Sequence, residues 1–130
     1  MKKNVEQNNG KLRVALYCRV ATDADEGKSL EAQKEKLRKY AEQQGYKVVE
    51  EIAEVAKGNT LRRAGIRRVY QLGYNKAMDL VLTETSSRFA RPANLLLRFH
   101  RKLRGYGVQA ITRREGALTA LLRSLYFHEE

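Results

Sequence analysis

The chain has 130 residues, of which 42% are hydrophobic and 32% are charged, and its formal net charge is +11. This length suits one domain with its own core, and this composition excludes a disordered chain. No apolar run is long enough to span a membrane.

Strand and helix patterns alternate along the chain. Apolar β-prone runs predict strands, and apolar residues spaced by three and four predict helices. In chain order they predict a strand over residues 12–18, a helix over 29–44, a strand over 46–52, a helix over 63–76, a strand over 79–83, a helix over 92–104, a strand over 108–112 and a helix over 118–127. Residues 55–61, between the second strand and the second helix, are expected to form a mobile loop.

Local signals mark where several of these elements begin and end. Ser29 can cap the first helix, and Gly45 can end it. Gly73 is expected to end the second helix early, and Pro92 suits the first turn of the third. The alternation predicts an α/β fold with three layers, in which a mainly parallel sheet of four to five strands has helices on both faces.

The positive charge is concentrated in the second half of the chain. Residues 1–60 hold 12 Lys or Arg against 10 Asp or Glu, a net of +2, whereas residues 61–130 hold 14 against 5, a net of +9. Twelve of those 14 are arginine, which binds phosphate through paired N–H groups. A DNA or RNA partner is therefore expected, and the alternative is a solvated basic surface.

Cysteine and histidine point to no cofactor. Cys18 is the only cysteine, so it cannot form an intrachain disulfide, and a reducing, cytoplasmic location is expected. The two histidines, His100 and His128, have no partner at metal-ligand spacing, and no glycine-rich nucleotide motif is present. We therefore expect neither a metal nor a nucleotide cofactor.

Basic and polar residues follow three of the predicted strands, at the ends where doubly wound sheets bind ligands. Arg88 and Arg91 are three residues apart where a helix is expected to begin, so both could contact one phosphate. The three groups are Arg19 with Ala21 and Thr22; Glu54 with the loop that leads to Arg62 and Arg63; and Ser86, Ser87, Arg88 and Arg91.

Together these groups resemble the catalytic domain of the serine recombinase (resolvase/invertase) family over about residues 12–115. The segments that carry the resemblance are 17–23 (YCRVATD), 29–33 (SLEAQ), 57–65, which is similar to a SGxxxxRxG loop, and 87–91, which is similar to a D/S-R-x-x-R motif. Lys57 departs from the serine of the loop pattern. The resemblance implies that Arg19, Arg63, Arg88 and Arg91 hold a DNA phosphate, and Glu54 falls where the family often has an aspartate.

Ala21 stands where that family has its nucleophilic serine. An alanine methyl cannot form the 5′-phosphoserine link to DNA, so the resemblance implies a site-specific recombinase domain that does not cut. The nearby hydroxyls of Thr22, Ser86 and Ser87 are not expected to replace it. Ala21 is explained by natural degeneration, by deliberate replacement or by an offset of one residue, and the fit of Arg-Val-Ala-Thr to Arg-Val-Ser-Thr disfavours the last.

The resemblance also implies partners. These are DNA and either a second copy of the chain, as a dimer or a synaptic tetramer, or a full-length recombinase. Residues 1–11 are expected to be a flexible leader, 12–115 the catalytic domain and 116–130 a shortened dimerisation helix, whose apolar residues either cover its own sheet or self-associate. Sequence-specific DNA recognition is expected to be absent or supplied elsewhere.

Two other functions compete with this interpretation. One is a non-catalytic DNA-binding or assembly module that partners an active recombinase or occupies DNA. The other is an unrelated receiver-like domain, which ranks last because no acceptor aspartate ends the third strand.

Overall fold

The computed structural model describes residues 10–22 and 26–126, with side chains from residue 30 onward in the second range. Its elements are β1 (Arg13–Val20), α2 (Glu26–Gln44), β2 (Lys47–Val55), α3 (Ala64–Tyr74), β3 (Leu80–Thr83), α4 (Ser86–Phe89), α5 (Ala93–Gly105), β4 (Gln109–Thr112), β5 (Gly116–Ala117) and α6 (Leu118–Tyr126). None of the described helices is long and apolar enough to cross a membrane.

The strands form one sheet in the order β2-β1-β3-β4-β5. The first four are mutually parallel, and only β5 runs antiparallel to its neighbour β4. The predicted mainly parallel α/β sheet is therefore confirmed. β1 lies between β2 and β3, which explains why its sequence is apolar almost without interruption.

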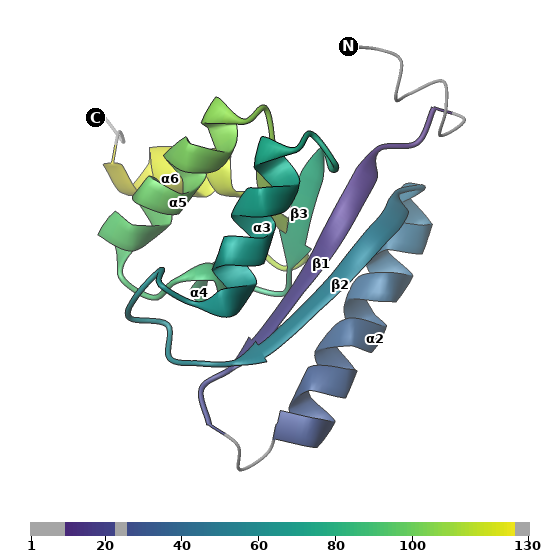
Figure 1. Cartoon of the computed structure of the whole chain (residues 1–130), viewed down its shortest axis with the longest axis horizontal. Helices are drawn as coiled ribbons and strands as arrows, with labels where there is room; N and C mark the ends of the chain where they lie inside the picture. The colour runs from purple at the N-terminus through teal and green to yellow at the C-terminus, as the bar shows by residue number, and fades with distance from the viewer. Residues whose placement is uncertain (1–9, 23–25, 127–130) are drawn as a thin grey trace.

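Helices cover both faces of this sheet, as predicted (Figure 1). Of the described helices, only α2 packs on one face, where Leu37 and Ala41 meet Val14, Leu16 and Cys18 of β1. The helices α3, α4, α5 and α6 share the other face, and their core also contains Ala15, Tyr17, Val81 and Ala110 from the strands. The alternation of β1 side chains between the two cores follows from the two-residue period of a strand.

The structure corrects several predicted boundaries. α2 begins at Glu26, so Ser29 lies inside its first turn and is not its cap. Gly45 does follow the helix with a φ of +77°, as a terminating glycine should. Pro92 is the residue before α5 rather than part of its first turn, and Gly73 is buried inside α3, where it does not end the helix.

Two short elements were not predicted. α4 has four residues and β5 has two, and neither is long enough to show a hydrophobic period. β2 also extends three residues beyond the predicted strand and takes in Glu54. Because α4 is separate from α5, Arg88 lies in a different helix from the one that follows Pro92.

Candidate nucleic-acid site at the strand ends

The predicted site residues come together at the carboxyl ends of the strands. In Figure 1 the arrowheads of β1 and β2 and the short α4 lie at the same end of the molecule. The register of these two strands pairs Arg19 with Glu54. Arg19 also hydrogen-bonds to the backbone of α4. The three groups of polar residues thus meet at the carboxyl ends of the strands, where parallel sheets commonly bind ligands. We call this place the strand-end edge.

Arg19, near the end of β1, is completely buried. Its Nε donates to the carbonyl of Arg88 at 2.8 Å, and its Nη2 donates to that of Ser87 at 2.6 Å. Its Nη1 donates to the carbonyl of Ala56 at 2.7 Å. Burial, and then the positive charge of Arg63, lower the pKa of this guanidinium from its usual value. Arg19 therefore joins β1 to α4 and to the residue after β2, and it faces carbonyls rather than solvent.

Gln33 of α2 holds the backbone of Arg19 from the other face of the sheet. The Arg19 N–H donates to Gln33 Oε1 at 3.2 Å, and Gln33 Nε2 donates to the Arg19 carbonyl at 3.1 Å. Nη1 of Arg88 donates to the same carbonyl at 2.9 Å. Gln33 was not predicted as a site residue, and its place in the segment 29–33 is the signal that would have found it.

Glu54 organises a second group of contacts. Its carboxylate accepts hydrogen bonds from the Tyr17 hydroxyl and, at 2.8 Å, from the backbone N–H of Gly65. Nε of Arg63 lies 3.6 Å from Glu54 Oε2. Burial, followed by the hydrogen bond to Glu54, raises the pKa of Tyr17 above its usual value, so Tyr17 remains a neutral donor. Tyr17 is a further residue whose part here was not predicted.

Arg63 links the loop between β2 and α3 to α4 through hydrogen bonds. Its guanidinium donates to the carbonyls of Phe89 and, at 3.2 Å, Lys57. Its Nε is buried and has no hydrogen-bond partner among the described residues. Only 5% of Arg63 is exposed, so this second arginine, like Arg19, supports the edge from inside.

Gly58 is the point where this loop crosses Arg19. A Cβ on Gly58 would lie 2.6 Å from Arg19 Nη2 and 3.0 Å from Arg91 Cγ, which is closer than side chains normally pack. We expect Gly58→Ala to lower the free energy of unfolding by about 1–3 kcal/mol, because the methyl would displace the guanidinium from its carbonyls. Urea denaturation followed by circular dichroism measures this loss.

The matched control is Gly105→Ala in α5. A Cβ there meets nothing within 4 Å, and alanine is favoured over glycine in a helix by up to about 1 kcal/mol. The control is therefore expected to be as stable as the parent chain or slightly more stable. Equal loss of stability in the two variants would contradict the close packing at Gly58.

The comparisons with known proteins decide the family. Residues 14–123 match the family model described as Resolvase, N terminal domain. The chain belongs to this family. The comparison with curated protein sequences gives no match.

Solved structures of serine recombinases share the fold of this resolvase-family domain. The N-terminal catalytic domain of TP901-1 integrase is 28% identical with a TM-score of 0.75, and the match covers 88% of this chain and 87% of that one. A resolvase family site-specific recombinase from Streptococcus pneumoniae is 30% identical with a TM-score of 0.75, covering 88% and 83%. The C-terminal catalytic domain of ISC1926 TnpA, an IS607-like serine recombinase, is 27% identical with a TM-score of 0.73, covering 88% and 78%.

The resolvase-family domain exposes only some of its predicted site residues. Ala21, Arg62 and Arg91 are exposed, and Arg88 is half-buried, whereas Arg19 is not exposed at all. The Nε of Arg88 is buried and has no hydrogen-bond partner within the described part of the chain. An anion bound at this edge could accept a hydrogen bond from this unpaired charged donor.

Arg88 and Arg91 do not enter one helix together, as the sequence had suggested. Arg88 lies in α4, Ala90 is extended with a φ of −165°, and α5 begins only at Ala93. The N–H of Arg91 donates to the Gly58 carbonyl at 2.9 Å, which places Arg91 beside the loop rather than on a helix. A shared contact with one phosphate stays a prediction, now based on the loop instead of helical spacing.

One other hydroxyl of the edge already has a partner, because Ser87 Oγ lies 3.1 Å from Thr85 Oγ1. Ser86 is buried, and its backbone N–H donates to Glu115 Oε1 at 2.7 Å. Glu115 therefore satisfies the first N–H of α4, a role that was not predicted. Across residues 10–22 and 26–126, no group of three or more His, Cys, Asp or Glu side chains could hold a metal ion.

Proposed function

We propose that this chain is a serine recombinase catalytic domain that binds DNA phosphate at the strand-end edge but cannot cut it. The observation that carries the proposal is Ala21, an exposed methyl two residues beyond Arg19, at the position where the family has its nucleophilic hydroxyl. Attack on phosphorus needs a nucleophile with a lone pair, and a methyl group has none.

Arginines suit the chemistry that the parent family performs. Phosphoryl transfer builds negative charge on the oxygens around phosphorus, and fixed positive donors lower the energy of that state. In this proposal Arg88 and Arg91 contact the phosphate directly. Arg19 and Arg63 position the loop and α4 from within, and each contributes positive charge. A serine at position 21 would form the 5′-phosphoserine bond and release a 3′-hydroxyl.

DNA binding tests the first half of this proposal. Arg91→Ala is expected to weaken binding to duplex DNA about 3- to 10-fold at 0.1 M salt, because one phosphate contact is lost. For the same reason, the slope of log affinity against log salt concentration should become shallower by about one. Fluorescence anisotropy of a labelled duplex over a series of salt concentrations measures both quantities.

Arg38→Ala is the charge-matched control for Arg91→Ala. Arg38 is exposed on α2, on the opposite face of the sheet from α4, where it forms an ion pair with Glu51 at 2.7 Å. The variant Arg38→Ala removes the same charge as Arg91→Ala and is expected to change the affinity for duplex DNA less than twofold. Equal weakening by both variants would show only a general charge effect and would contradict a phosphate site at the strand ends.

A second candidate function is a non-catalytic assembly module that pairs with a second copy or with an active recombinase. α6 favours it, because Leu118 and Leu122 pack on the sheet while Leu125 remains 51% exposed at the end of the helix. Both roles foreseen for this helix, covering its own sheet and self-association, therefore stay compatible with the fold. Light scattering of Leu125→Lys and of the parent chain separates the two roles. If α6 is an assembly face, the variant should have a lower molar mass in solution than the parent chain, and otherwise the two masses should be equal.

A further inference from the structure

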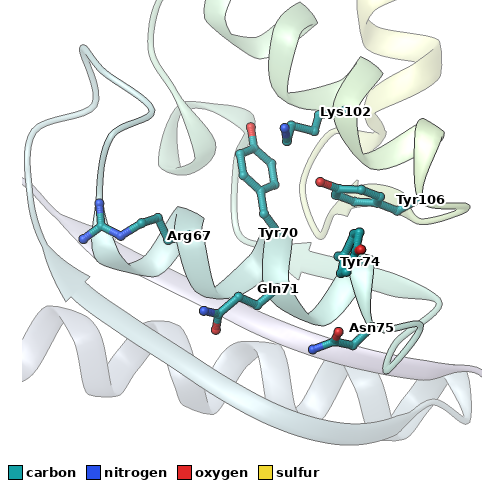
Figure 2. A pocket seen from close by; sticks show the side chains of 7 residues that line it. All are labelled: Arg67, Tyr70, Gln71, Tyr74, Asn75, Lys102 and Tyr106. Carbon is teal, nitrogen blue, oxygen red and sulfur yellow. The ribbon is translucent and has the colours of Figure 1, made fainter.

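A pocket lies between α3 and α5, away from the strand-end edge. It has a volume of about 350 Å³ and is lined by Arg67, Tyr70, Gln71, Tyr74, Asn75, Lys102 and Tyr106 (Figure 2). Lys76, which follows α3, accepts a hydrogen bond on its carbonyl from Arg13 at the start of β1. The aromatic end of the pocket is therefore near the amino ends of the strands, opposite the arginine site.

Three tyrosines form the aromatic part of this tyrosine pocket. The ring centroids of Tyr74 and Tyr106 are 6.0 Å apart at 83°, and those of Tyr70 and Tyr106 are 6.5 Å apart at 69°. A Cβ on Gly73 would lie 2.8 Å from the Tyr106 ring, so glycine is what allows this ring to lie against α3. Figure 2 shows the three side chains converging from the two sides of the pocket.

Tyr74 is the ring that remains available to a ligand. It is 71% exposed, which is unusual for a large aromatic side chain. Lys102 Nζ lies 5.2 Å from the centroid of Tyr70 and 5.9 Å from that of Tyr106, so its ammonium already occupies the space over those two rings. A flat partner would therefore stack on Tyr74.

The charge around the pocket favours an anionic partner. Arg67 and Lys102 line it, and no carboxylate does. Arg67 and Tyr74 are seven residues apart on α3, so they share one face of the helix with Tyr70 between them. The Arg67 side chain has no ion pair among the described residues. Rings beside unpaired cations are the surface on which single strands bind, because bases stack and phosphates follow the positive charge.

We propose that the tyrosine pocket binds single-stranded nucleic acid, with one base stacked on Tyr74 and the adjoining phosphates near Lys102 and Arg67. Duplex DNA does not fit this site, because its bases are stacked on one another and offer no free face. The proposal is independent of the phosphate site at the strand ends and describes a second contact on the same domain.

The test uses the whole chain with Arg88→Ala and Arg91→Ala already in place, so that the strand-end edge contributes little. The probe is a labelled ten-nucleotide oligothymidylate, and anisotropy gives its Kd. Adding Tyr74→Ala is expected to weaken binding about 10-fold, since one base loses its stacking partner. Tyr74→Phe keeps the ring and is expected to stay within twofold of the background chain.

A duplex probe of the same length and thermal denaturation serve as controls. Tyr74→Ala is expected to change duplex affinity less than twofold and to lower the melting temperature by no more than about 6 °C, because the side chain is largely exposed and loses one ring contact, with Tyr106. Unchanged oligothymidylate binding in Tyr74→Ala, or equal loss on the single strand and the duplex, overturns the proposal. So does an acidic peptide that binds through Tyr74 when the oligonucleotide does not. If instead the proposed phosphate site at the strand ends is wrong, Arg91→Ala alone will leave the affinity for duplex DNA unchanged.

Discussion

Changing Ala21 to serine is expected to give a domain that becomes covalently attached to DNA, whereas the chain with Ala21 is expected to form no such link. The new hydroxyl would stand at the exposed end of β1, beside the edge where the arginines gather. Loss of a serine nucleophile in another enzyme lowers the rate by a factor on the order of 10⁶, so the expected difference is between adducts and none. Supercoiled DNA of random sequence, quenched in denaturant and analysed for protein-linked ends, measures it.

The control for this gain of function is Ala21→Val. It changes the same exposed position without an oxygen, so it should bind DNA as the parent chain does and form no adduct. Adding Arg91→Ala to the serine variant should reduce the adduct, because a charged donor to the phosphate is lost. A serine variant that binds duplex DNA like the parent and yet leaves no adduct in the random pool would contradict the proposed function.

Replacing Arg19 by alanine is expected to destabilise the domain by about 3 kcal/mol or more. Its guanidinium makes three hydrogen bonds to the carbonyls of Ala56, Ser87 and Arg88. Hydrogen bonds from a charged donor are worth about 1.5–3 kcal/mol each, and buried carbonyls left without a donor add to the loss. Relief of the desolvation of the charge offsets part of this sum.

Urea denaturation followed by circular dichroism measures the change. A loss of this size is a large share of the about 5–15 kcal/mol that stabilises a typical domain. Arg19→Lys is expected to fall between the parent and Arg19→Ala, because one ammonium cannot reach three carbonyls in the geometry of the guanidinium fork.

Arg91→Ala supplies the comparison for Arg19→Ala. Arg91 is exposed, and its substitution is expected to change stability by no more than about 0.5 kcal/mol. Arg19→Ala should thus impair the fold, whereas Arg91→Ala should impair only DNA binding. If the two variants were equally stable, Arg19 would not have the internal role that its contacts indicate.

The elements that the sequence predicted well are those with long local patterns. The strands at 12–18 and 79–83 and the helix at 92–104 agree with β1, β3 and α5 to within two residues at each end. Their apolar periods lie within the elements themselves, and the proline and glycine signals of α5 lie at its two ends. α4 and β5 have too few residues to carry a period, so they became visible only in the fold.

The family was predicted from the sequence alone and is confirmed, because it depends on which residue stands at which position of a motif. The proposal that Ala21 replaces the nucleophile comes from the same motif. What only the tertiary structure decided is which arginines face inward. Arg19 and Arg91 look alike in a sequence, yet the first is fully buried and the second exposed. Burial depends on partners from elsewhere in the chain, here a carbonyl 69 residues away, and no local pattern encodes such a contact.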